Sequence, residues 1–202
     1  MRKNVILIVT LGLMAIGLQS CQLIVDSIVY RKKYPTEVKL TDGTLLVGRA
    51  KLPQAYTKKV AIEAEDGTKQ KVKATDIASL TAANELNPEQ PHRMMYLPKG
   101  QGKCWIALAK AGEHVVFFAG GRNYKVDKHG TMTVSGKAIN YYAFRSGEEW
   151  PTWLTSTNTG WGNRKRYQAY FADDPELCEA IAEKEIKPLD LERICKEYNP
   201  KK

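Results

Sequence analysis

Two Asp-Gly pairs, each set between alternating apolar and polar residues, constrain the fold of this chain more than any other feature. The pairs are Asp42-Gly43 and Asp66-Gly67, and the stretches beside them are residues 36–40, 44–52, 59–65 and 68–74. An Asp-Gly pair between two such stretches favours the tight turn of a β-hairpin. Gly48, inside the second stretch, indicates a bulge or a sharp bend. We therefore expect residues 36–83 to form a small β-barrel-like module of four or five bent strands.

A second β region follows a polar segment that contains Pro88 and Pro91. Its apolar stretches are residues 94–97, 104–109, 114–119, 124–126, 131–134 and 139–145, and each is separated from the next by a glycine-containing turn. Regular turn signals at this spacing predict an antiparallel meander. Strands and helices do not alternate along the chain, which disfavours a parallel nucleotide-binding sheet.

The C-terminal part has the pattern of helices. Residues 164–171 are one candidate, and a second helix is expected after Asp174, which can cap it, with Pro175 at its first position. A third helix, after Pro188, would place apolar side chains at helical spacing, namely Leu191, Ile194, Cys195 and Tyr198. The expected fold is therefore α+β and mostly antiparallel β, in which residues 92–202 form a β meander with a C-terminal helical cap.

The N-terminus has the layout of a secretory signal peptide. Arg2 and Lys3 precede an apolar block at residues 5–18, and the small residue Ser20 follows it. The block is shorter than the roughly 20 apolar residues that a transmembrane helix needs. Apolar residues continue beyond it, so an uncleaved transmembrane helix over residues 5–25 is an alternative.

The signal ends in the motif LQSC at residues 18–21, which resembles the lipobox of bacterial lipoprotein precursors. This resemblance implies that the Cys21 thiol receives a diacylglyceryl group, that the peptide before Cys21 is removed and that the new amino terminus is acylated. Residues 1–20 would then be the signal peptide and residues 21–35 the lipid anchor and tether. In an ordinary signal peptide, Cys21 would instead remain unmodified. Gln22 is not the aspartate that signals inner-membrane retention in enteric lipoproteins, and no acidic run that resembles a surface-export signal follows Cys21. We therefore expect an outer-membrane lipoprotein that faces the periplasm.

Four segments of the sequence resemble uncharacterised exported proteins of Gram-negative bacteria. They are VKLTDGTLLVGRAKLP and EDGTKQKVKATDIASL in the first β region, and YFADDPELCEAI and ERICKEYN near the C-terminus. The resemblance implies export and a small β module with a helical ending. It implies no particular enzymatic activity.

The chain of 202 residues carries a formal net charge of +9, which falls to +7 once Arg2 and Lys3 leave with the signal peptide. Inside a cell, such an excess would favour a nucleic-acid partner. Export argues against nucleic acid and favours anionic lipid headgroups, an acidic glycan or an acidic envelope protein. The sequence has no CxxC pair and no cysteine–histidine pair at zinc spacing, so we expect no metal and no cofactor.

The segment 148–167 is the strongest candidate for a ligand-binding region. It holds three of the four tryptophans in a stretch rich in threonine, serine and glycine, and it ends in a basic run. The candidate residues are Trp150, Trp153, Trp161, Arg164, Lys165 and Arg166. Flat aromatic faces suit sugar rings, and cations beside them suit acidic glycans or phosphates. Alternatively, Trp150 and Trp153 belong to the core, and only Trp161, which lies between glycines, is exposed.

Three cysteines remain if Cys21 carries lipid, so at least one thiol is unpaired. Cys178 and Cys195 lie eight and nine residues from a connection centred near Ile186, a spacing that would put them at the same level of an antiparallel helix pair. A disulfide between them is therefore a candidate, and the oxidising envelope would permit it. Two buried free thiols are the alternative. Cys104 would be the odd thiol.

Residues for catalysis are sparse. The histidines form neither a pair at helical spacing nor part of a nucleophile motif, and they are His92, His114 and His129. Asp173 and Asp174 fit a helix start. Glu148 and Glu149 lie beside aromatic residues, as the carboxylates of glycoside hydrolases do, but neighbours on a strand point to opposite faces. We therefore expect a membrane-anchored envelope lipoprotein that acts as a binding or structural module. A hydrolase acting on envelope glycan or glycolipid is the alternative function.

Overall fold

The computed structural model describes residues 32–159 and 163–200. The chain divides between Lys33 and Tyr34, and every described strand and helix belongs to the compact unit Tyr34–Lys202. The expected signal peptide, Cys21 and most of the expected tether lie outside the described residues. Within the described ranges, no helix is long and apolar enough to cross a membrane.

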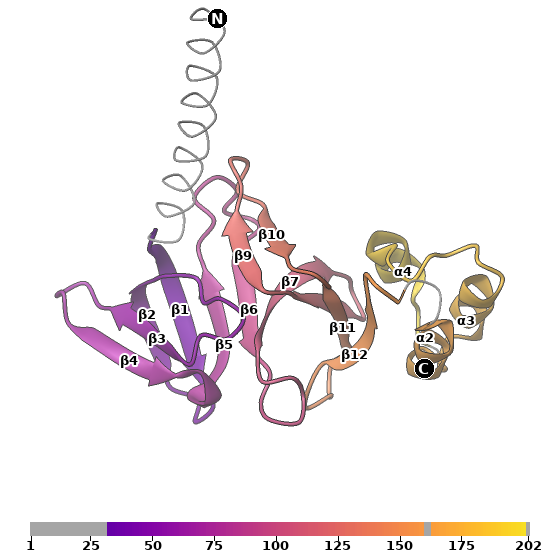
Figure 1. Ribbon diagram of the computed structural model, residues 1–202, viewed down its shortest axis with the longest axis horizontal. Helices are drawn as coiled ribbons and strands as arrows, with labels where there is room; N and C mark the ends of the chain where they lie inside the picture. The colour runs from indigo at the N-terminus through magenta and orange to yellow at the C-terminus, as the bar shows by residue number, and fades with distance from the viewer. Residues whose placement is uncertain (1–31, 160–162, 201–202) are drawn as a thin grey trace, which may run out of the picture. The chain divides into compact units, whose positions relative to one another are not determined.

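Ten of the described strands pair antiparallel in one sheet, in the order β12-β11-β8-β7-β6-β5-β1-β2-β3-β4 (Figure 1). They are β1 (Tyr34–Leu40), β2 (Leu45–Ala50), β3 (Lys59–Glu63), β4 (Lys69–Lys73), β5 (Ile77–Ala82), β6 (His92–Tyr96), β7 (Trp105–Ala111), β8 (Val116–Gly120), β11 (Asn140–Phe144) and β12 (Thr152–Ser156). A 3-10 helix, η1 (Ala74–Asp76), links β4 to β5. β9 (Asn123–Val126) and β10 (Met132–Ser135) pair only with each other. The large sheet is not closed as a barrel, so β12 and β4 are its edges.

The expected fold class is confirmed, because the protein is mostly antiparallel β with three helices at its C-terminus. β5 pairs with β6 across the segment 83–91, with Leu80 opposite Met94. The strands of the two expected β regions therefore follow one another in a single sheet.

Both Asp-Gly hairpins form as expected. In the turn between β1 and β2, Gly43 has a φ of +89°, and Asp42 Oδ1 accepts a hydrogen bond from the backbone N–H of Thr44 at 2.9 Å. The turn between β3 and β4 repeats this arrangement. Gly48 lies where β2 meets β3, and a Cβ atom there would be only 2.5 Å from the carbonyl oxygen of Glu63. A glycine at this position therefore allows β2 to approach β3 closely.

The core of the first part of the sheet is organised by Trp105, which is fully buried at the start of β7. Its backbone N–H donates to the carbonyl of Ala55, and its Nε1–H donates to the carbonyl of Thr57, both at 2.9 Å. From β9, the Tyr124 hydroxyl donates to the carbonyl of Trp105. The Gln54 side chain makes two further hydrogen bonds with the backbone of Tyr124. Trp105 thereby joins three segments that are distant in the sequence: the loop before β3, β7 and β9.

Three short helices pack against the β8, β11 and β12 part of the sheet. They are α2 (Arg164–Tyr170), α3 (Pro175–Ala182) and α4 (Leu191–Glu197). Their apolar side chains form one cluster with Phe117 and Leu154 of the sheet. Figure 1 shows the helices grouped beside β11 and β12, at the far end of the sheet from β4. The expected cap of α3 is confirmed, since Asp174 Oδ1 accepts the N–H of Leu177 at 3.0 Å.

His92, at the start of β6, is a buried histidine with an unsatisfied nitrogen. Its side chain is 5% exposed, and its Nε2 has no hydrogen-bond partner within the described part of the chain. The ring packs edge-on against Tyr34, with 6.0 Å between ring centroids. Burial lowers the pKa of His92, because the charged ring would lose its hydration.

We expect the protein to lose stability as the pH falls below 6.5, the ordinary pKa of histidine. Below this pH the unfolded chain binds a proton at His92 that the folded protein resists, so the free energy of unfolding falls by up to about 1.4 kcal/mol per pH unit. His92→Leu should lack this part of the pH dependence. Urea unfolding at about pH 7.5 and about pH 5.5 measures it. His129→Gln, which changes an exposed histidine, is the matched control, and an unaltered pH dependence in His92→Leu would contradict this origin.

Candidate functional site

Trp153 and Arg166, two of the candidate ligand-binding residues, are brought together by the fold. Trp153 lies on β12 and Arg166 in the first turn of α2, and the guanidinium carbon is 4.1 Å from the centroid of the indole ring. This distance is that of a cation–π contact. The indole is partly buried against a cluster that includes Phe118 and Tyr142, and its Nε1–H donates to Asn140 Oδ1 at 3.2 Å. The indole is therefore held by the sheet, and the guanidinium covers one of its faces.

A network of side-chain hydrogen bonds ties the start of α2 to the end of β12. Asn163 Nδ2 donates to Thr155 Oγ1 at 3.2 Å and to Thr159 Oγ1 at 2.7 Å, and Thr155 is fully buried. Asn163 directly precedes α2, yet its side chain caps none of the helical N–H groups. Its hydrogen bonds go to β12 and the turn after it instead, and they help to set the position of Arg166 over the indole.

The first turn of α2 carries three cations, Arg164, Lys165 and Arg166, and no acidic residue. Cations are unfavourable there, because the positive end of the helix dipole lies at the N-terminus. Arg164 has a structural contact, since its Nη1 donates to the carbonyl of Ala182 at the end of α3 at 2.9 Å. Among the described residues, no carboxylate forms a salt bridge with Lys165 or Arg166. The described part of the chain therefore does not neutralise these two charges.

The remaining tryptophans of the segment have less defined roles. Trp150 is half-buried in the connection before β12. Trp161 lies outside the described residues. Trp153 fits both interpretations in part, because one part of its ring packs with the sheet and another contacts an exposed cation.

The candidate disulfide between Cys178 and Cys195 is not formed in the structure, and both thiols are free, as is that of Cys104. Cys178 Sγ lies 3.1 Å from the carbonyl oxygen of Phe171, next to α2, whereas Cys195 Sγ lies 3.9 Å from the carbonyl oxygen of Val115, next to the sheet. The two helices thus present their cysteines to different neighbours. Burial raises the pKa of all three thiols, which keeps them protonated and lowers their reactivity.

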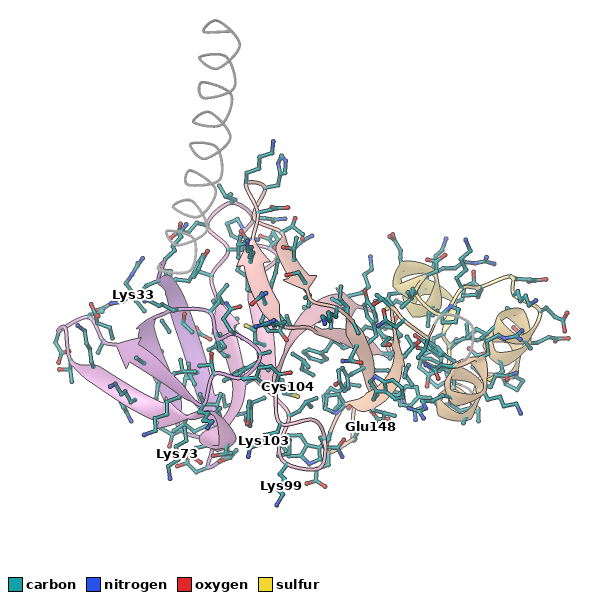
Figure 2. All side chains as sticks on the ribbon, in the orientation of Figure 1. Lys33, Lys73, Lys99, Lys103, Cys104 and Glu148 are labelled. Atoms are coloured by element: carbon teal, nitrogen blue, oxygen red, sulfur yellow. The ribbon has the colours of Figure 1, made fainter. Side chains whose placement is uncertain are left out.

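Glu148, which Figure 2 labels, belongs to an ionic network around Arg145, just after β11. The guanidinium donates to Glu148 Oε1 at 3.1 Å and to Asp173 Oδ2 at 3.0 Å. It also lies 4.4 Å from the centroid of the Tyr170 ring. The Tyr198 hydroxyl is 2.9 Å from Arg145 Nη1 and donates to Asp173 Oδ2 at 2.8 Å. We call these five residues the Arg145 cluster.

The carboxylates of the Arg145 cluster are occupied by internal donors. Glu148 Oε2 accepts both the backbone N–H of Arg145 at 2.9 Å and the Tyr170 hydroxyl at 2.8 Å. Burial, together with the hydrogen bond to Glu148, raises the pKa of Tyr170, so this hydroxyl stays a donor. The cluster joins the connection after β11 to α2, to the turn before α3 and to the end of α4. This arrangement supports a structural role and does not provide the two free acids that glycoside hydrolysis requires.

Hollows lie beside the Arg145 cluster and at the β1–β3 part of the sheet. One, of about 700 Å³, lies beside the Arg145 cluster and is also lined by His114 and Phe144. The other is a groove of about 1230 Å³ whose charged lining consists of Arg49 and the carboxylates Glu37, Glu63, Glu65, Asp66 and Glu85. An excess of carboxylates disfavours an anionic ligand in this groove. Within residues 32–159 and 163–200, no group of three or more histidine, cysteine or acidic side chains could hold a metal ion.

Sequence reasoning missed the Arg145 cluster. It placed Asp173 at a helix start and Tyr198 in an apolar helical stripe, and both assignments describe the local structure correctly. The contact between Arg145 and Tyr198 spans 53 positions of the chain, so no local pattern could reveal it. The one available signal was the polar tip of a tyrosine at the end of an apolar stripe.

We expect Arg145→Met to lower the free energy of unfolding by about 2 kcal/mol, because Glu148, Asp173 and the Tyr198 hydroxyl lose a charged donor. Chemical denaturation measures this loss. Arg193→Met is the matched control, since it removes an ion pair with Glu197 in which the side chains are 43% and 39% exposed. Such exposed contacts contribute little to stability, so Arg193→Met should lose much less than Arg145→Met. Equal losses in the two variants would contradict the structural role of the cluster.

Comparisons of the chain with protein-family models, with curated proteins and with solved structures gave no match. A functional proposal therefore rests on the residues and their geometry. Among the surfaces described above, the Trp153–Arg166 pair with Lys165 combines an aromatic ring with cations that no described carboxylate neutralises.

Proposed function

We propose that the protein is a lipid-anchored protein of the bacterial envelope whose folded body binds an anionic glycan. The observation that carries the proposal is the cation of Arg166, fixed over the indole of Trp153 and free of described salt-bridge partners. An acidic sugar presents carboxylate or phosphate groups on a ring, so it needs cations next to a flat surface. The pair of Arg166 and Trp153 offers both, with Lys165 as a second cation.

The stacking of Arg166 decides which sugars the surface favours. A neutral sugar would need a bare aromatic face, and Arg166 already covers one face of the Trp153 ring. An acidic sugar can instead pair with the planar guanidinium, which binds carboxylates and phosphates through two parallel hydrogen bonds. The geometry thus favours charge recognition over the stacking of a neutral sugar.

The lipid anchor is proposed from the motif at residues 18–21, and the extent of the folded body is consistent with it. The compact unit starts at Tyr34, so residues 22–33 would connect the lipid on Cys21 to the body. Such a connection spans at most about 45 Å when fully extended. The body would therefore stay close to the membrane surface, which we propose is the periplasmic side of the outer membrane.

Binding is tested by retention on an immobilised acidic polysaccharide such as heparin. We expect Arg166→Gln to weaken retention about tenfold, since one charge-assisted hydrogen-bonding group contributes about 1.5 kcal/mol. Lys165→Glu should also weaken retention, yet raise the free energy of unfolding by about 0.5 kcal/mol, because an acid replaces a cation in the first turn of α2. Lys187→Gln, at an exposed lysine beyond α3, is the control. Unchanged retention of Arg166→Gln would refute the proposed site.

Anchoring is tested by metabolic labelling with a fatty-acid analogue. We expect the wild-type protein to be labelled and Cys21→Ala to be unlabelled, because the acyl groups of a lipoprotein are carried by the cysteine of the lipobox. When Cys21→Ala is combined with a cleavable signal peptide, the protein carries no lipid. We expect this variant to appear in the soluble fraction rather than in the membrane fraction. Equal labelling of the two proteins would remove the lipoprotein assignment.

A further inference from the structure

One end of the strands β3 to β7 carries five exposed lysines and an exposed tyrosine. These residues, which we call the lysine end, are Tyr56, Lys58, Lys59, Lys73, Lys99 and Lys103. They come from the loop before β3, the first residue of β3, the end of β4 and the loop between β6 and β7. Figure 2 shows Lys73, Lys99 and Lys103 at the same end of the sheet, and Lys33 at the other.

Strand register places the lysines together. Lys59 lies directly opposite Lys73 in the β3–β4 hairpin. Lys99 and Lys103 lie in the loop that joins β6 to β7, and the adjoining Trp105 binds the carbonyls on both sides of Tyr56. The two loops are therefore held side by side. Tyr56 is 72% exposed, although its neighbours in the chain are fixed by these hydrogen bonds.

The charges of the lysine end oppose one another and are not neutralised by described acids. Lysines directly opposite each other on paired strands repel and destabilise the pair. None of the five lysines forms a salt bridge within the described residues. Two carboxylates, Asp42 and Asp76, also lie at this end; they form no salt bridge with these lysines, and the five lysines exceed them by three charges.

Protection of an open sheet edge explains only part of this charge. β4 is an edge strand, and lysines on an edge strand discourage pairing with another chain. That argument covers Lys73. It does not cover Lys58, Lys99 and Lys103, which lie on loops or beside an interior strand.

The opposite end of the same strands is acidic. Glu65 and Asp66 lie in the β3–β4 turn, and Glu85 lies in the loop after β5, where all three line the acidic groove. The compact unit also begins near that end, since Pro35 and Thr36 line the same groove as Glu65 and Asp66. Glu65 and Asp66 are thus separated from Lys59 and Lys73 by the length of the β3–β4 hairpin, and Lys69, which lies near the two carboxylates, pairs with Glu63 at 3.6 Å.

We infer that the lysine end rests on anionic lipid headgroups of the membrane to which the protein is anchored. Lysine is a compact point charge that attracts an anionic surface without requiring a planar, two-pronged partner, whereas arginine suits individual carboxylates and phosphates. The lysine end contains no arginine. A tyrosine with a polar tip on an apolar ring is also typical of membrane–water interfaces. The charge separation would turn the acidic groove away from the bilayer.

The length of the connection to Cys21 permits this orientation. β1 has seven residues and spans about 23 Å, and residues 22–33 reach up to about 45 Å. Either end of the strands could therefore face the bilayer, and electrostatic attraction selects the lysine end. The inference depends on the proposed lipid anchor, which brings the body to a membrane, but the contact itself needs no acyl chain.

The test uses the unacylated chain from Gln22 onward, which keeps the whole compact unit, and vesicles of phosphatidylcholine and phosphatidylglycerol in equal parts. We expect salt-sensitive binding to these vesicles and none to vesicles of phosphatidylcholine alone. Lys59→Gln/Lys73→Gln/Lys99→Gln should bind about 100-fold more weakly, since each lysine near an anionic surface contributes about 1 kcal/mol. Circular dichroism and thermal melting show whether the variant keeps its fold.

Matched controls separate this inference from a general effect of charge and from the proposed function. Lys137→Gln/Lys187→Gln/Lys196→Gln removes three exposed lysines outside the lysine end and should bind the mixed vesicles nearly as well as the wild type. Equal losses in the two triple variants, or equal binding to both vesicle types, would overturn the inference. Because the chain carries no lipid, these results are independent of labelling at Cys21. Heparin that abolishes the vesicle binding of the wild type but not that of Arg166→Gln would assign the attraction to α2. This result would also overturn the inference.

Discussion

The fold depends on the burial of Trp105 with all of its polar groups satisfied. A large apolar ring is favourable in the core only if its N–H finds a partner, because a buried unpaired donor costs free energy. Trp105 satisfies its donors with two carbonyls of the loop before β3, and its own carbonyl accepts the Tyr124 hydroxyl from β9. This set of bonds keeps the loop before β3 packed on β7 and brings the β9–β10 ribbon onto the first part of the sheet. The rigid placement of Tyr56 and its neighbouring lysines follows from the same bonds.

A second set of polar contacts performs the corresponding task at the other end of the sheet. Arg145 links the connection after β11 to α2, the turn before α3 and the end of α4. The helices are short, and isolated helices of seven or eight residues are marginal in water, so they depend on packing against the sheet. The cluster and the apolar contacts around Phe171 supply that packing. The position of Arg166 over Trp153 is therefore a product of tertiary structure rather than of helix propensity.

The protein combines two cationic surfaces with one acidic groove, and their separation suits a body held beside a membrane. The lysine end belongs to the β3–β7 part of the sheet, whereas the Trp153–Arg166 pair lies at the β12 edge. If the lysine end meets anionic headgroups, a surface on a distant strand is left to bind a glycan. In the two proposals above, these surfaces would meet an anionic membrane and an acidic glycan, respectively. The carboxylates of the Arg145 cluster are occupied by internal donors.

The sequence by itself determined the features that depend on neighbouring residues. The Asp-Gly turns, the capped start of α3 and the apolar stripe of α4 are all set by contacts within a few positions, so local pattern revealed them. The signal layout and the LQSC motif are also local patterns, and they lie outside the described residues. Tertiary structure alone decided the order of the ten strands, the separate β9–β10 pair and the partners of Arg145, because hydrogen bonds and ion pairs across dozens of positions leave no periodic trace. It also decided the fate of the thiols: the spacing in the sequence predicted that Cys178 and Cys195 lie at the same level, whereas in the structure Cys178 contacts the carbonyl of Phe171 and Cys195 that of Val115.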